Sequence, residues 1–160
     1  MKVFLEKVNI GTESEGVIYE FLIHGRLNSN QIIYIHDDAA KFDLRNFENQ
    51  VVEILLVAHN ISLKTTSRRP DTQLIDRELR VIKGNYLGRY VLPNEWHDSK
   101  YFHNERSYKY WHHLDLHAIK AENGIFIITN ENAEKLPIEK GEKSYFYVDS
   151  FYMIAWHPIE

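Results

Sequence analysis

Residues 51–63 read VVEILLVAHNISL, and this stretch decides the fold class. Apolar residues occupy both parities of the stretch: Val51, Leu55, Val57, Ile61 and Leu63 on one, and Val52, Ile54, Leu56 and Ala58 on the other. A strand with two apolar faces is typical of the centre of a sheet. The β-branched content favours a strand, although periodicity alone does not exclude a buried helix. We predict a central strand at 51–63, with Leu55 and Val57 in the core.

The first 63 residues, with the central stretch included, predict a meander of about five strands. The clearest is VIYEFLIHGRL at 17–27, in which apolar and polar residues alternate as in a half-buried strand. The other predicted strands are Val3–Ile10, Gln31–His36 and the short Lys41–Leu44. A turn at Gly11–Gly16 separates the first two.

The residues after the central stretch begin with a polar linker, Thr65–Asp71, which contains Pro70. Leu74, Ile75, Leu79 and Ile82 then recur at helical spacing, and they predict a helix over Thr72–Ile82. Strand character returns at Asn85–Leu92.

The C-terminal part predicts a hairpin around Asn123-Gly124, the dipeptide typical of a type I′ turn. This turn would place Glu122 opposite Ile125. His117 would then share a face with the apolar residues Ile119, Ala121, Phe126 and Ile128. A helical turn at Asn132–Leu136 and two strands, Ser144–Val148 and Phe151–Trp156, complete the chain.

These elements predict an all-β chain of roughly nine or ten strands, forming a single domain over 1–160. We expect a small β-barrel, because the succession of glycine, strand, turn and strand in each half is similar to that of the oligonucleotide/oligosaccharide-binding (OB) type. The alternative is two β modules that share a core, with halves 1–64 and 84–160 joined by the linker and helix at 65–83. No residue motif identifies a family.

Composition narrows the function classes. The chain has no cysteine, which excludes disulfides and thiolate metal sites, and it has no stretch approaching 18 apolar residues. We therefore expect a cytoplasmic protein without a membrane partner. The net charge is −4, although residues 64–89 hold seven basic and three acidic residues. A duplex DNA-binding protein is usually basic overall, which argues against that partner.

An enzyme hypothesis rests on His113, Asp115 and His117, which would share one face of a strand and could bind a metal ion. His113 and His117 would lie about 13 Å apart on a flat strand, which is too far to bind one ion together without a bend. A third ligand would have to come from elsewhere, with His97, His103 or Glu105 as candidates. A β-bulge near His117 would instead bury Leu114 and Leu116 and leave the polar residues in solvent. We favour the bulge and expect no metal and no cofactor.

The segment Pro93–Trp111 holds six aromatic residues together with Lys100, Arg106 and Lys109. We predict a long loop that contributes little to folding. Its aromatic rings could stack on the bases of a single-stranded nucleic acid, could anchor a protein interface, or could cover an open barrel end.

We expect a non-catalytic intracellular binding module that recognises a protein partner, in the manner of an inhibitor or immunity-type protein. The predicted contact residues are Trp96, Tyr101, Phe102, Arg106, Tyr108, Tyr110 and Trp111. The first alternative is a single-stranded nucleic-acid-binding protein that adds Arg68, Arg69, Arg77, Arg80 and Arg89 to the same rings. The second is a metal-dependent hydrolase centred on His113, Asp115 and His117.

Overall fold

The computed structural model describes residues 1–63 and 78–159, and most of them lie in one extensively paired sheet. The strands are β1 (Lys2–Ser14), β2 (Val17–Arg26), β3 (Ile32–Asp38), β4 (Val51–Leu63), β5 (Val81–Arg89), β6 (Leu116–Ala121), β7 (Gly124–Thr129) and β8 (Lys143–Pro158). The helices are α2 (Glu105–His113) and α3 (Asn130–Glu134), with 3-10 turns η1 (Leu44–Phe47), η2 (Asn94–Trp96) and η3 (Ser99–Tyr101). The predicted all-β class is confirmed.

Strand β4 occupies the centre of the sheet, and its bounds are those predicted for the central stretch. It pairs with β8 in antiparallel register from Val52↔Pro158 to Leu63↔Phe146. Leu55 and Val57 are each 5% exposed, so their predicted core positions are confirmed.

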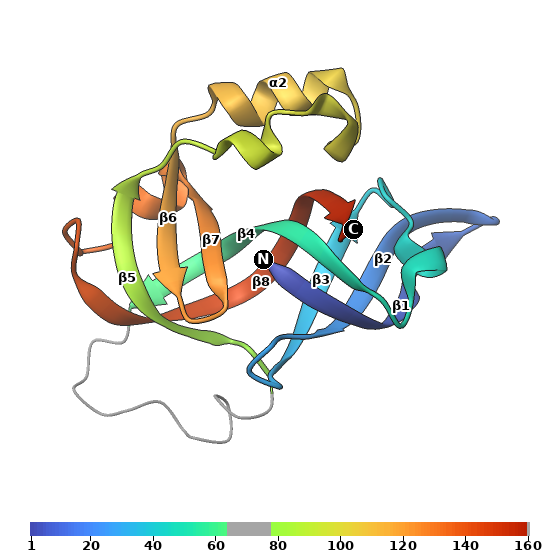
Figure 1. Ribbon diagram of the computed structural model, residues 1–160, viewed down its shortest axis with the longest axis horizontal. Helices are drawn as coiled ribbons and strands as arrows, with labels where there is room; N and C mark the ends of the chain where they lie inside the picture. Colours follow the sequence, from blue (N-terminus) through green and yellow to red (C-terminus); the bar gives the residue numbers. More distant parts are fainter. Residues whose placement is uncertain (64–77, 160) are drawn as a thin grey trace.

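The sheet closes on itself twice, and both closures use β4 and β8 (Figure 1). One ring runs β1-β2-β3-β8-β4 and returns to β1 through the pairs Lys2↔Glu53 to Phe4↔Val51. The other runs β4-β7-β6-β5-β8, with β5 paired to β8. Sheet pairing therefore crosses the two halves of the sequence, because β8 belongs to both rings.

The buried side chains form two cores, which β4 separates. The first core contains Ile54, Leu56 and Ala58 of β4, and includes Val3, Leu5, Ile23, Ile33, Ile35, Ile119, Phe126, Ile128 and Phe146. The second core contains Leu55 and Val57 of β4 together with Leu92, Trp96, Phe102, Leu116, Ala118, Ile127, Ile154 and Ala155. Strand β4 is apolar on both faces because each face packs into a different core.

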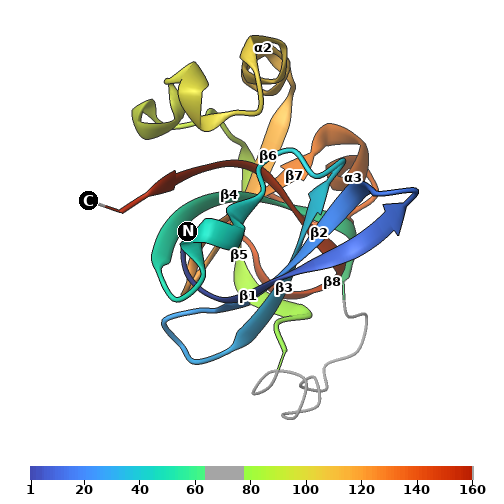
Figure 2. The ribbon, with the colours of Figure 1, turned by 90° about the vertical axis from the view of Figure 1, so that its right-hand side faces the viewer.

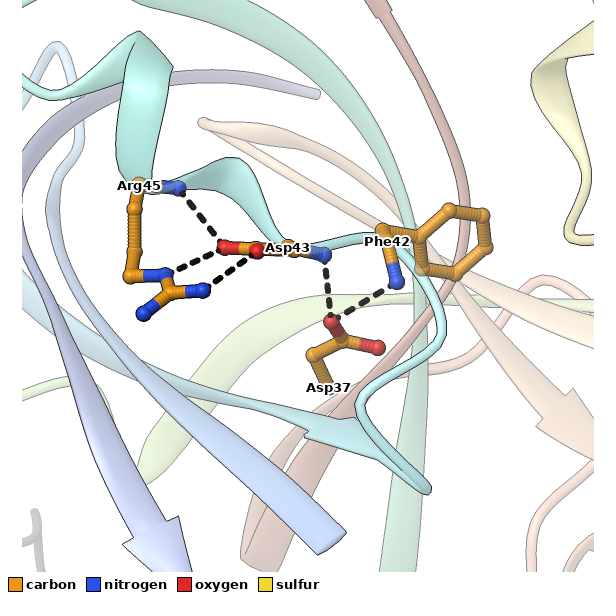
Figure 3. A network of polar contacts seen from close by, with 4 residues as sticks. All are labelled: Asp37, Phe42, Asp43 and Arg45. Carbon is orange, nitrogen blue, oxygen red and sulfur yellow. Dashed lines mark hydrogen bonds and ion pairs between the residues drawn. The ribbon is translucent and has the colours of Figure 1, made fainter. Parts of the chain in front are cut away.

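The predicted strand at Lys41–Leu44 is wrong, because the buried carboxylate of Asp37 folds this segment into a loop (Figure 3). Asp37 accepts hydrogen bonds from the backbone N–H groups of Lys41 at 2.9 Å, Phe42 at 2.9 Å and Asp43 at 3.1 Å. Asp43 in turn accepts two bonds from the guanidinium of Arg45, at 2.7 Å each. The loop satisfies its backbone through a side chain and leads directly into η1.

The predicted helix at Thr72–Ile82 falls largely outside the described residues. Its C-terminal end is not helical, because Glu78 bridges to Ile32 and Val81 begins β5. Backbone hydrogen bonds from Leu79 N to Ile32 O and from Val148 N to Arg80 O hold this segment between β3 and β8. Strand pairing replaces the local helical preference here.

The predicted hairpin forms, but its turn lies one residue earlier than expected. Ala121 pairs with Gly124, so Glu122 and Asn123 make the turn, and neither has the positive φ that a type I′ turn requires. The shift preserves the predicted faces: Ile119, Phe126 and Ile128 share the first core.

The two strands predicted near the C-terminus are one continuous strand, β8. The interruption expected at Asp149-Ser150 is only local, because Ser150 pairs with His59 and Val148 with Ile61. With this merger and the loop at 41–44, the described residues contain fewer strands than predicted.

Candidate functional site

The aromatic segment at 93–111 is folded and is not the long loop that the sequence predicted. Asp98 accepts a hydrogen bond from Lys100 N at 3.0 Å and begins η3, and Asn104 accepts one from Ser107 N at 2.8 Å and caps α2. The turns and the helix form a layer beyond the strands (Figures 1 and 2). This layer covers the second core.

Two of the predicted contact residues are core residues. Trp96 is 2% exposed and Phe102 is 5% exposed, and both belong to the second core. Phe102 packs edge-on against Tyr108 and against His112, with centroid separations of 5.4 Å in each case. Neither Trp96 nor Phe102 presents a ring to a partner in this conformation.

The other predicted contact residues lie at the surface. Tyr110 is 57% exposed and Arg106 is also exposed, whereas Tyr101, Tyr108 and Trp111 are half-buried against the second core. None of the nine residues of α2 is buried. The helix is therefore attached by one half-buried side and is open on the other.

A groove lies beside this layer, at the seam between the two closed rings of strands. It consists of two adjoining cavities of about 410 and 460 Å³, which share Lys2 of β1 and Glu53 of β4 as lining residues. The first cavity is also lined by Asn28, Leu55, Tyr90, Trp96, Asn123 and Ile125, and the second by Lys100, Tyr101, His157, Pro158 and Ile159. We call the two cavities together the seam groove.

The seam groove combines aromatic rings with charges of both signs. His157 packs against Tyr101 at 4.7 Å and against Trp96 at 5.1 Å between ring centroids. The ammonium of Lys100 lies 5.1 Å from the Tyr101 centroid and 3.1 Å from the Asp98 carboxylate. Burial, with a smaller contribution from Glu95, raises the pKa of the Tyr90 hydroxyl, which stays protonated near neutral pH. This lining suits a ligand with both apolar and polar parts.

The sequence did not indicate Lys2, Glu53 or His157 as members of a site. They lie far apart in the chain, and strand pairing brings them together: Lys2 pairs with Glu53, and Glu53 pairs with His157. An alternating Lys or Glu in a strand carries no local signal of a groove.

The expected strand bearing His113, Asp115 and His117 is wrong, because the three residues belong to different elements. His113 ends α2, Asp115 lies in the connection, and His117 is in β6. The expected bulge at His117 is also wrong, since the irregularity lies in β5 between Tyr86 and Gly88. Leu116 enters the second core without a bulge, because both faces of β6 are covered.

His117 is part of a hydrogen-bonded chain and is not free in solvent. The Tyr86 hydroxyl donates to His117 Nδ1 at 2.6 Å, and His117 Nε2 donates to Asn130 Oδ1 at 3.0 Å. Burial, with a smaller contribution from Asp115, raises the pKa of the Tyr86 hydroxyl, which keeps it a donor near neutral pH. This chain ties β5 and β6 to the start of α3.

The proposed third metal ligands are also separated. His97 hydrogen-bonds the backbone oxygen of Leu92, His103 hydrogen-bonds that of Lys41, and Glu105 begins α2. Within residues 1–63 and 78–159, no three His, Asp or Glu side chains are grouped as metal ligands.

The basic residues named for nucleic-acid binding are only partly described. Arg68, Arg69 and Arg77 lie outside the described residues. Arg80 precedes β5 and pairs with Glu78 at 3.1 Å, whereas Arg89 ends β5 and lies 3.5 Å from Asp115. The two described arginines are thus at opposite ends of the same strand.

No protein-family model, curated protein or solved structure matches this chain. Among the helices in the described part of the chain, none is long and apolar enough to cross a membrane.

Proposed function

We propose that the protein is a non-catalytic binding module that recognises a protein partner through α2 and the adjoining seam groove. The observation that carries this proposal is the state of α2, an aromatic-rich helix with no buried residue and with Tyr110 57% exposed. Large apolar rings at a surface, next to a basic side chain, are the residue types that dominate protein interfaces. An inhibitor or immunity-type role is compatible with the net charge of −4.

The geometry of α2 concentrates the exposed contact residues on one side. Arg106 and Tyr110 are four residues apart and therefore share a face of the helix. Trp111 packs edge-on against Tyr110 at 5.4 Å, so the exposed ring rests on a half-buried one. A partner that covered this face would bury both rings at little cost in side-chain entropy.

The positions of Arg80 and Arg89 favour a protein partner over single-stranded nucleic acid. A nucleic-acid groove needs cations and stacking rings along one continuous path. Strand β5 separates the two arginines by roughly 30 Å at about 3.3 Å per residue, and each arginine already faces a carboxylate.

We also infer that the ring β1-β2-β3-β8-β4 is an OB-like barrel. Three features support this inference: β1, β2 and β3 form an antiparallel meander, β3 pairs with β8 in parallel, and β4 closes on β1. Barrels of this type present the β2–β3 face and adjacent loops to ligands.

The test is capture of the natural partner by the full chain, comparing wild type with the double variant Arg106→Ala, Tyr110→Ala. Both residues are exposed, so the unfolding midpoint should stay unchanged while the affinity for the partner falls by at least about tenfold, or about 1.4 kcal/mol. The matched control is Tyr19→Ala, which removes a tyrosine that is 52% exposed on β2.

Equal capture by the wild type and the double variant would place the contact elsewhere. Loss of capture after nuclease treatment, together with a steep fall in affinity as the salt concentration is raised, would indicate that the partner is a single-stranded nucleic acid.

A further inference from the structure

A second surface lies on the outer face of β2 and β3, on the opposite side of these strands from the first core. The odd-numbered residues are buried from Phe21 to Gly25 of β2 and from Ile33 to Asp37 of β3, and Leu22, His24, Tyr34 and His36 alternate with them. Direct cross-strand pairing places His24 beside Tyr34 and Leu22 beside His36. Strand β8 continues this face, because His36 pairs with Tyr152.

Ring stacking fixes the side chains on this face. His24 stacks on Tyr34 with centroids 5.0 Å apart, and His36 stacks on Tyr152 at 5.2 Å. The carboxylate of Glu20 contacts His36 Nδ1 and orients that imidazole. The stacking on His24 orients the Tyr34 side chain, which is 37% exposed.

A groove of about 340 Å³ opens beside Tyr34, between β3 and β8. It is lined by Leu22, Tyr34, His36, Glu78, Leu79, Arg80, Val148, Asp149, Ser150 and Phe151. Strand β3 lies between β2 and β8 in the sheet, so Tyr34 stacks on His24 from the β2 side and lines this groove on the β8 side.

The groove carries an uncompensated negative charge. Arg80 is paired with Glu78 at 3.1 Å, whereas Asp149 receives a hydrogen bond from the Asn60 amide at 3.4 Å and has no ion-pair partner within the described residues. A phosphate group would be repelled by this set of charges.

We propose that this groove binds the guanidinium group of an arginine side chain on a partner protein. A planar guanidinium can stack on the Tyr34 ring, which is 37% exposed, and pair with the carboxylate of Asp149. Its donors can also reach the hydroxyl of Ser150, which lines the same groove. The groove is separate from α2 and the seam groove, so it provides a second contact with its own chemistry.

The test is a titration of the full chain with Nα-acetyl-arginine amide, followed by NMR. We expect saturable chemical-shift changes at Tyr34, Asp149 and Ser150. The citrulline analogue has nearly the same shape without the charge, and it should bind at least about tenfold more weakly. Asp149→Asn and Tyr34→Leu should each weaken arginine binding by at least about tenfold, whereas the control variants Glu13→Gln and Tyr19→Leu should not.

Three results would overturn the proposal: shift changes centred away from the groove, equal binding of the citrulline analogue, or undiminished binding by Asp149→Asn. Asp149 and Tyr34 are both exposed, so both variants should fold and the comparison remains interpretable. Arg106→Ala, Tyr110→Ala should leave this titration unchanged, which separates its outcome from that of the function proposed for α2.

Discussion

The most informative perturbation is the replacement of Phe102 by alanine, because it separates a structural role of the aromatic segment from a binding role. Phe102 is 5% exposed, and its ring contacts Tyr108 and His112 edge-on within the second core. Truncation of a buried phenylalanine costs about 3 to 5 kcal/mol, through lost transfer free energy and a residual cavity. With a urea slope of about 2 kcal/mol/M, a loss of about 4 kcal/mol lowers the midpoint by about 2 M.

The matched comparison is Tyr110→Ala, which removes a ring of similar size from the same segment. Tyr110 is 57% exposed, so its removal should change the free energy of unfolding by no more than about 1 kcal/mol. Urea unfolding, followed by tryptophan fluorescence and by circular dichroism, measures both variants. If Phe102→Ala shifted the midpoint by less than about 0.5 M with an unchanged slope, the segment would be the dispensable surface loop that the sequence suggested.

Two further predictions concern stability. Leu55→Ala and Leu56→Ala should each lower the free energy of unfolding by about 2 to 5 kcal/mol in urea titrations, because neighbouring residues of β4 fill different cores; a loss below about 0.5 kcal/mol for either would remove that face from the core. Burial raises the pKa of Asp37 above its ordinary 3.8, a shift that the backbone N–H groups of Phe42, Asp43 and Lys41 only partly oppose. The folded state thus binds this proton more tightly than the unfolded state, and the stability it contributes is complete below about pH 3.8 and is lost as pH rises through the raised pKa. Relative to Asp37→Asn, the wild type should therefore become less stable as pH rises from about 4, and a difference that stayed constant or changed in the opposite direction would contradict this reasoning.

Several elements were predictable because their signals are local. Residues 51–63 are apolar at both odd and even positions, and this pattern predicted β4 with its bounds. The alternation of apolar and polar residues from Val17 onward predicted β2. Both patterns report which faces of a strand are buried, which is a property of the strand's own residues. The predicted face of His117, Ile119 and Phe126 held despite the shifted turn, because moving the turn by one residue leaves the alternation of faces intact.

Other features depended on residues far apart in the chain. The segment at 41–44 became a loop because Asp37 supplies acceptors to its backbone, and residues 78–82 joined the sheet because β3 and β8 offered hydrogen-bonding partners. The rings at Trp96 and Phe102 are buried because a second apolar face of β4, β6 and β7 was available to receive them.

The candidate sites are products of the tertiary structure. The seam groove needs Lys2, Glu53 and His157, and the groove beside Tyr34 needs Tyr34, Arg80 and Asp149. The sequence by itself determined that strands would form and which of their faces would be apolar, since alternation is a short-range property. Only the closure of the sheet through β4 and β8 decided which polar side chains share a groove, because pairing between distant strands depends on how both cores are filled.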